Sequence, residues 1–159
     1  MKFQQVCLAG TTAGRTWQQE VMQRLRGRGV GQEQIFYSQL ANSAQSTEHD
    51  TRREEAAQED PSTIMLIYVC PPGSIRRPSD RAAAEILDPF ALFLIGTYGM
   101  CKPHRTAVVF EELAFAHNGE SRKILEKIKN RLVGKFGQPG PPYFERLSLA
   151  EDWIVTQLT

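Results

Sequence analysis

The chain has few cysteines, no long hydrophobic run and almost no net charge. Its three cysteines, Cys7, Cys70 and Cys101, are too few and too scattered for a disulfide framework. No segment approaches the roughly 18 apolar residues of a membrane span, and the first residues lack the apolar core of a signal peptide. These absences favour a reducing, cytoplasmic compartment and predict no membrane partner.

The charge balance and the spacing of cysteine and histidine argue against nucleic-acid binding and against a metal site. A formal net charge of +1 argues against a nucleic-acid surface driven by bulk charge. Cys101 and His104 have a CxxH spacing, but no second ligand pair accompanies them, and a tetrahedral metal site needs three or four ligands. We therefore expect no metal, no redox cofactor and no nucleic-acid partner.

What the chain does contain is ordinary for a globular protein. Hydrophobic residues make up 41% and charged residues 23% of its 159 residues. That length is enough for one domain with a sizeable core, so we expect a single domain over residues 1–159.

Short apolar segments alternate with helical patterns along the chain. Residues 64–69 are continuously hydrophobic, as is typical of a central parallel strand buried on both faces. The alternation predicts an α/β fold, a doubly wound and mostly parallel five-stranded sheet of order 2-1-3-4-5. The expected strands cover residues 6–9, 35–37, 64–69, 106–110 and 143–147.

Helical periodicity fills the intervals between these strands. The expected helices begin near Trp17, near Ser79, near Phe90 and before Ile124, and a last one follows the capping-box pair Ser148 and Glu151. In the Ile124 helix, Lys123, Lys127 and Lys129 are expected on the solvent face. Residues 47–59 are predicted to be an exposed helix or a mobile segment.

A sheet of this order has its ligand crevice at the carboxyl ends of strands 1 and 3. Residues 10–14 and 70–79 should meet there. The turn Gly10-Thr11-Thr12-Ala13-Gly14 suits a sugar or a phosphate, although a plain strand-to-helix turn has the same composition. Arg76, Arg77 and Arg81 could hold a phosphate or form a solvated basic loop.

Glu85 follows Ser79 and Asp80 on an alanine-rich helix start. A carboxylate among small residues beside a site-forming loop could be a nucleophile or a base, or a solvated helix residue. The acidic residues Glu54, Glu55, Glu59 and Asp60 precede the third strand and are most simply interpreted as a solvated face.

The order of these motifs resembles the nucleoside 2-deoxyribosyltransferase superfamily, which includes deoxynucleoside 5′-monophosphate N-glycosidases. The resemblance covers most of the chain and rests on residues 6–12, Trp17, residues 64–69 and Ser79 through Glu85-Ile86. It implies that Glu85 is the nucleophile on the anomeric carbon. It also implies that Ser79, where nucleoside transferases carry an aspartate, accepts a 5′-phosphate.

Three positions depart from the family's pattern. Leu87 stands where a glycine follows the nucleophile, and Cys7 stands where a tyrosine orients it. The pair Ser62-Thr63 replaces Ala-Asp before the third strand, so either Asp60 assists the leaving base from a shifted loop or the general acid is missing.

The sequence therefore predicts an enzyme that hydrolyses or transfers the N-glycosidic bond of a nucleoside 5′-monophosphate or nucleoside. Its catalytic residues would be Glu85 and Asp60. The substrate would contact Gly10, Thr11, Thr12, Arg77, Ser79 and Arg81. The resemblance also implies a homodimer. The alternatives are a catalytically degenerate nucleotide-sensing module of the same fold and a flavodoxin-like scaffold with its site elsewhere.

Overall fold

The computed structural model describes residues 2–10, 17–37, 55–69, 89–110, 119–132 and 140–158. Its strands are β1 (Gln5–Gly10), β2 (Ile35–Tyr37), β3 (Thr63–Val69), β4 (Thr106–Phe110) and β5 (Tyr143–Phe144). Its α-helices are α1 (Trp17–Gly27), α3 (Pro89–Leu94), α4 (Gly119–Leu132) and α5 (Leu147–Leu158). Residues 55–59 are also helical. Shorter helical pieces are η1 (Gln32–Gln34), η4 (Ile95–Gly99), which is π-helical, and η5 (Pro103–Arg105).

The five strands form one sheet in the order β2-β1-β3-β4-β5, and each neighbouring pair is parallel. This confirms the predicted doubly wound α/β fold. The longest pairing joins β1 to β3, from Gln5 opposite Thr63 to Gly10 opposite Tyr68. Because β1 and β3 are neighbours, their carboxyl ends lie side by side at the point where the strand order reverses.

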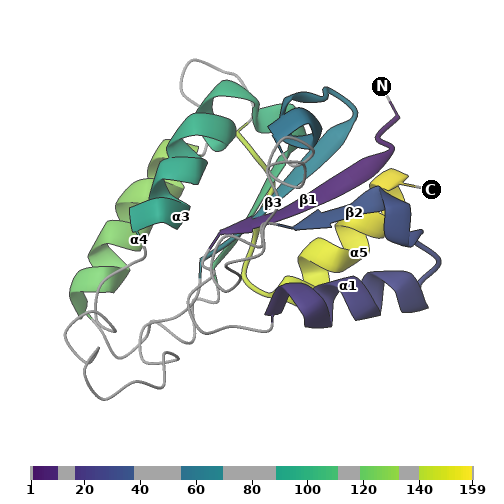
Figure 1. Cartoon of the computed structure of the whole chain (residues 1–159). Coiled ribbons are helices and arrows are strands. Elements are labelled where there is room, and N and C mark those ends of the chain that lie inside the picture. The colour runs from purple at the N-terminus through teal and green to yellow at the C-terminus, as the bar shows by residue number, and fades with distance from the viewer. Residues whose placement is uncertain are drawn as a thin grey trace, which may run out of the picture.

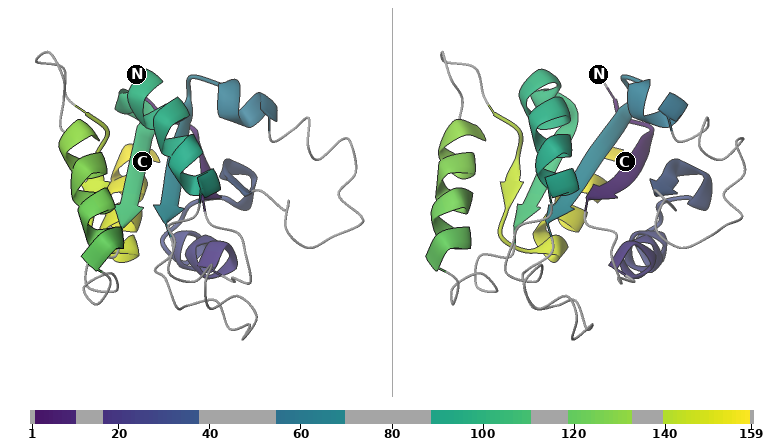
Figure 2. Two further views of the ribbon diagram at one scale, coloured as in Figure 1. Left: turned by 90° about the vertical axis from the view of Figure 1, so that its left-hand side faces the viewer. Right: turned by 60° about the vertical axis from the view of Figure 1, so that its left-hand side comes forward.

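Helices cover both faces of the sheet (Figure 1). Helices α1 and α5 lie on one face and α3 and α4 on the other, and the turned views in Figure 2 show the same arrangement. The side chains of β3 alternate between the two layers. Ile64, Leu66 and Tyr68 pack with α1 and α5, whereas Met65, Ile67 and Val69 pack with α3. All seven residues of β3 are buried, which explains its continuous hydrophobicity.

Several local expectations need correction. Helix α5 begins at Leu147, so Ser148 lies inside its first turn rather than at its cap, and β5 ends at Phe144. Lys129 was expected to face solvent, but its ammonium lies over the ring of Tyr143, 4.7 Å from the centroid. Its charge therefore contacts an aromatic face, which attracts a cation through the ring's electrons.

Other expectations hold or fall outside the described residues. Trp17 is buried and Trp153 is partly buried in the layer of α1 and α5, as helix-packing residues. The expected helix start at Ser79 lies outside the described residues, as do Cys70, His49 and His117. No helix among the described residues is long and apolar enough to cross a membrane.

Candidate functional site

The carboxyl end of the sheet brings the last residue of β1 against β3. Gly10 pairs with Tyr68, and its backbone has φ +118°. A Cβ atom at this position would overlap the backbone carbonyl and amide of Tyr68. Only glycine combines that φ with so close a backbone approach, so Gly10 sets how the chain leaves β1.

The first turn of α1 packs against the same end of β3. The rings of Trp17 and Tyr68 meet edge to face with their centroids 5.0 Å apart. The buried Gln18 amide donates a hydrogen bond to the carbonyl of Leu8, with 3.1 Å between the atoms. These contacts fix the start of α1 over β1 and β3, where the sequence predicted a site.

Most of the predicted site residues follow the ends of these two strands. Glu85 and five predicted substrate contacts lie outside the described residues: Thr11, Thr12, Arg77, Ser79 and Arg81. Of the predicted contacts, Gly10 is described, and it stands where the prediction placed it, at the carboxyl end of β1.

Asp60 lies at the other end of the sheet. It precedes β3, whose seven residues span roughly 23 Å at about 3.3 Å per residue. Gly10 pairs near the far end of that strand, opposite Tyr68. The structure therefore does not bring Asp60 together with Gly10. Parallel strands have their amino ends at one edge of the sheet and their carboxyl ends at the other, so Asp60 lies at the edge opposite the predicted crevice.

Asp60 has a local structural role instead. One carboxylate oxygen accepts hydrogen bonds of 2.7 Å from both the amide and the hydroxyl of Ser62. The other oxygen accepts one of 3.0 Å from the side-chain amide of Gln5. The Ser62 hydrogen bonds lower the pKa of Asp60, because they favour its charged form. This is the pattern of an Asx turn that leads into a strand.

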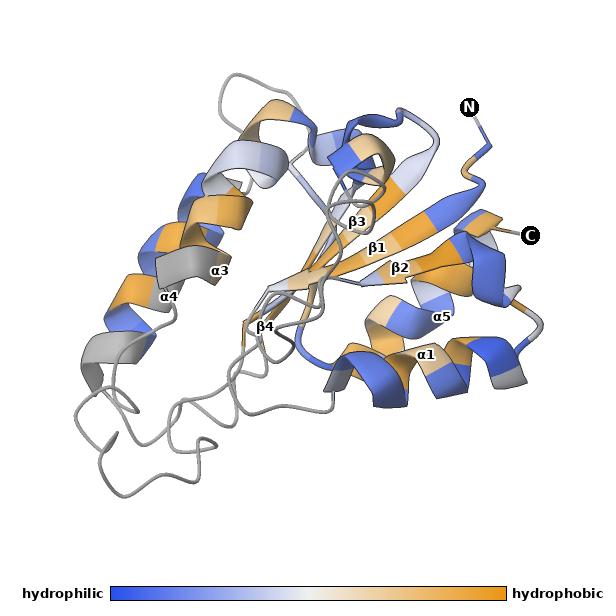
Figure 3. Cartoon of the chain, in the orientation of Figure 1, coloured by the Kyte–Doolittle hydropathy of each residue, from blue (hydrophilic) through white to orange (hydrophobic). Residues whose placement is uncertain are grey.

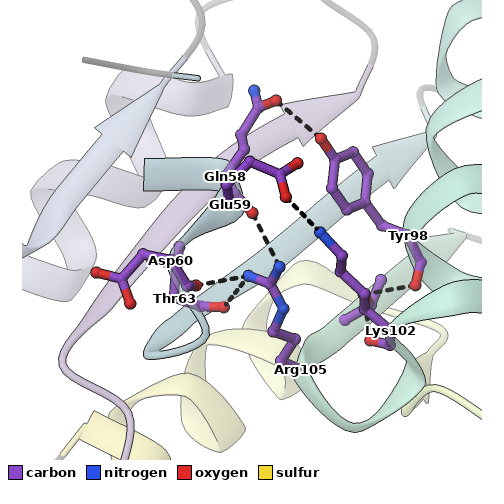
Figure 4. Close-up of polar contacts among 8 residues, drawn as sticks. Gln58, Glu59, Asp60, Thr63, Tyr98, Lys102 and Arg105 are labelled. Atoms are coloured by element: carbon purple, nitrogen blue, oxygen red, sulfur yellow. Dashed lines mark hydrogen bonds and ion pairs between the residues drawn. The ribbon is translucent and has the colours of Figure 1, made fainter. Parts of the chain in front are cut away.

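Sequence reasoning missed a polar cluster at this edge, which we call the amino-end network (Figure 4). At its centre is Arg105, a residue that is only 2% exposed. Its guanidinium donates to the backbone carbonyls of Asp60, Thr63 and Gln58 at 2.7, 3.2 and 3.0 Å. The network consists of Gln58, Glu59, Asp60, Thr63, Tyr98, Lys102, Arg105 and Thr106.

The outer part of the network joins the helix at residues 55–59 to η4. The Tyr98 hydroxyl donates to Gln58 at 3.0 Å, and the Lys102 ammonium donates to Glu59 at 2.9 Å. The hydrogen bond from Lys102 lowers the pKa of Glu59. The network holds backbone in place, and its geometry does not resemble a catalytic arrangement.

The predicted solvated face holds for Glu55 and Glu59, which are both exposed, and Glu54 lies outside the described residues. Asp60 is the exception, because it is only partly exposed and its carboxylate is held by Ser62 and Gln5.

The structure also places Cys7 and the CxxH pair Cys101 and His104. Cys7 is fully buried on the α3 side of β1, in the apolar layer with Met65 and Ile67. Cys101 and His104 are both exposed. Among the residues that the structure describes, no group of three or more histidine, cysteine or acidic side chains could hold a metal ion.

No protein-family model, curated protein or solved structure matches this chain. Its function has to be inferred from its own residues and their geometry.

Proposed function

We propose that the chain binds a nucleoside 5′-monophosphate, or a nucleoside, at the carboxyl end of β1 and β3 and cleaves its N-glycosidic bond. The observation that supports this most is the pairing of Gly10 with Tyr68 at the point where the strand order reverses. Ligands of open α/β sheets bind outside the carboxyl ends of the strands at such a point. The segments that carry the predicted substrate contacts both continue from there.

The chemistry follows from the residues that the resemblance singles out. The Glu85 carboxylate would attack C1′ of the sugar, and the bond from C1′ to the base nitrogen would break as the base leaves and gains a proton. Water, or a second base, would then attack C1′ and release Glu85, as in retaining glycosidases. A hydroxyl at Ser79 and the guanidinium groups of Arg77 and Arg81 suit a 5′-phosphate, which a carboxylate at position 79 would repel.

The test is release of free base from a panel of ribo- and deoxyribonucleoside monophosphates and nucleosides. We expect wild-type protein to release base from at least one of them and Glu85→Gln to lose at least a hundredfold in rate. Glu33→Gln is the matched control, because Glu33 is exposed in η1, which leads into the amino end of β2. Release that persists in Glu85→Gln, or its absence from wild type, would overturn the glycosidase proposal.

A nucleotide-sensing module is the second candidate, and two placements favour it. Cys7 lies in an apolar layer where the resemblance expects a tyrosine hydroxyl to orient the nucleophile. Asp60 lies at the amino end of β3, away from the proposed site. Losing a general acid typically costs 10²–10⁴ in rate. Titration calorimetry that shows nucleotide binding without release of base would select this candidate.

A homodimer belongs to the same proposal, since sites of the resembling superfamily are often completed by a neighbouring subunit. A second copy would have to dock on a surface that a single copy leaves uncovered.

A further inference from the structure

The buried side chain of Gln18 lies at the carboxyl edge of the sheet, next to the proposed site. Gln18 is the second residue of α1 and is 8% exposed. It lies against β1, and Figure 3 shows β1 and its neighbours β2 and β3 to be mainly hydrophobic. Its side-chain amide donates to the carbonyl of Leu8, which pairs with Tyr37, the last residue of β2. The carboxamide is therefore placed where β2 ends, two residues before β1 ends at Gly10.

The hydrogen bond to Leu8 settles how the two polar atoms of this carboxamide are arranged. A backbone carbonyl only accepts, so the NH₂ group must face it and the oxygen, Oε1, must face elsewhere. No donor among the residues that the structure describes contacts Oε1. A buried acceptor without a donor destabilises a fold, so each one calls for an explanation.

The other buried polar residues of the described ranges have partners that explain them. Arg105 donates to three backbone carbonyls, and Glu151 accepts from an arginine of α1. The hydroxyl of Thr63 accepts from a glutamine of β1, and that of Thr106 contacts two backbone carbonyls. Gln18 differs because its acceptor lacks a partner at the edge where we propose that a ligand binds.

We infer that Gln18 is a binding residue of the proposed site and that its Oε1 accepts a hydrogen bond from the nucleotide or nucleoside. The inference rests on the proposed function, since it assigns one contact within that site. A carbonyl oxygen carries partial negative charge and repels a phosphate, so the 5′-phosphate is held elsewhere, as the predicted arginine contacts imply. Gln18 suits a neutral donor, which a nucleoside offers as an amino group on its base or a hydroxyl on its sugar.

Such a contact gives the site selectivity. A site that pairs with a donor of its ligand rejects the analogue lacking that donor, because the protein's own polar group is then left buried and unpaired. Exchanging the amino group of adenine or cytosine for an oxygen sets two acceptors against each other. If Gln18 served only to hold Leu8, the donors of the ligand would make no difference to it.

The first experiment measures nucleotide binding by titration calorimetry with matched ligands. Adenosine and inosine monophosphate differ in the base amino group, as do cytidine and uridine monophosphate, and the 2′-deoxy and 3′-deoxy forms each lack one sugar hydroxyl. All proteins carry Glu85→Gln, so that the ligand stays intact during the titration. We expect at least one matched pair to differ tenfold or more in Kd, and Gln18→Met to reduce that difference to threefold or less. The pair that responds identifies the donor.

Gln23→Met is the matched control, because Gln23 is an exposed glutamine of the same helix. It should keep every difference between paired ligands. Unchanged preferences in Gln18→Met, or an equal loss of affinity for all ligands that leaves their ratios intact, would overturn the inference and leave the proposed function standing. Absence of binding to every ligand would overturn the proposed function as well, so the two failures are distinguishable.

The second experiment needs no substitution at Gln18 and stays decisive if Gln18→Met does not fold. In wild-type protein with isotope-labelled glutamine, nuclear magnetic resonance reports the side-chain carbonyl signal of Gln18. We expect saturation with the preferred ligand to shift this signal and saturation with its matched partner to shift it less, while the signal of Gln23 stays in place. A Gln18 signal that responds equally to both members of every pair would exclude the hydrogen bond to the ligand.

Discussion

At the scale of single residues, Arg105 shows how a charge can serve purely to complete backbone hydrogen bonding. Its guanidinium donates to the carbonyl of Gln58, at the end of the helix of residues 55–59, and to the carbonyls of Asp60 and Thr63, on either side of the turn into β3. The sequence offers little warning of this. Arg105 stands directly before an apolar strand, where a charged residue is normally expected to reach solvent.

Replacing Arg105 by methionine keeps most of the side chain's apolar length and removes its donors. Three carbonyls would then lose the same donor group, two of them at the turn before β3. We expect Arg105→Met to lower the free energy of unfolding by about 2–4 kcal/mol, because the protein loses hydrogen bonds from a charged donor and buried carbonyl oxygens lose their partner. Chemical denaturation followed by circular dichroism measures the change.

Lys102→Met is the control for the loss of positive charge. The Lys102–Glu59 pair joins a partly exposed ammonium to a carboxylate that is 71% exposed, and such pairs contribute little to stability. A loss in Lys102→Met as large as that in Arg105→Met would show that charge, rather than the buried donors, stabilises this edge.

At the scale of elements, hydrophobic pattern predicted β1, β3 and β4 well because both faces of each strand are covered. It predicted α5 less well. Glu151 looked like the partner of a cap at Ser148, but it lies on the buried side of α5 with Ile154 and Leu158. Their spacing of three and seven residues marks one helix face and could have revealed this. What the pattern could not reveal is the distant arginine that pairs with Glu151.

The junction after β1 gives the sharpest prediction at this scale. Gly10→Ala would force a Cβ atom into the backbone of Tyr68 at a φ that alanine rarely adopts. We expect a loss of about 3 kcal/mol or more in unfolding free energy, from strain and overlap together. Thermal and urea unfolding provide the measurement.

Gly27→Ala is the matched control, because the space around Gly27 is open and it ends α1. Alanine there should be neutral or stabilising by up to about 1 kcal/mol. Equal losses in the two variants would mean that Gly10 is not specially constrained, and would remove the structural reason for placing a site at this end of β1.

At the scale of the whole molecule, the order of the strands was predictable from the sequence. Alternating strands and helices indicated the order that the structure has. The same topology also fixes which residues lie at the amino edge of the sheet and which at the carboxyl edge. It separates the residues before β3 from the residues after β1, because all strands run in one direction. Asp60 could therefore have been assigned to the amino end from sequence alone, once the parallel sheet was accepted.

The first and last helices are joined by an ion pair that links distant parts of the chain. Arg24 of α1 donates three hydrogen bonds of 2.8–3.0 Å to the carboxylate of Glu151 on α5. The bond to Glu151 raises the pKa of Arg24, so the guanidinium stays charged throughout the accessible pH range. The carboxylate is only 3% exposed, whereas the arginine side chain is 46% exposed.

That asymmetry predicts unequal effects of removing the two partners. Arg24→Met would leave a buried carboxylate without its cation, and we expect a loss of about 2–3 kcal/mol, less than for a fully buried pair because Arg24 is half exposed. Glu151→Met would leave a cation that water can solvate, and should cost about 1 kcal/mol. The double variant should lie within about 1 kcal/mol of wild type, because it buries no unpaired charge. Urea denaturation of all four proteins gives the coupling energy directly, and strictly additive losses would show that Arg24 and Glu151 contribute to stability independently of each other.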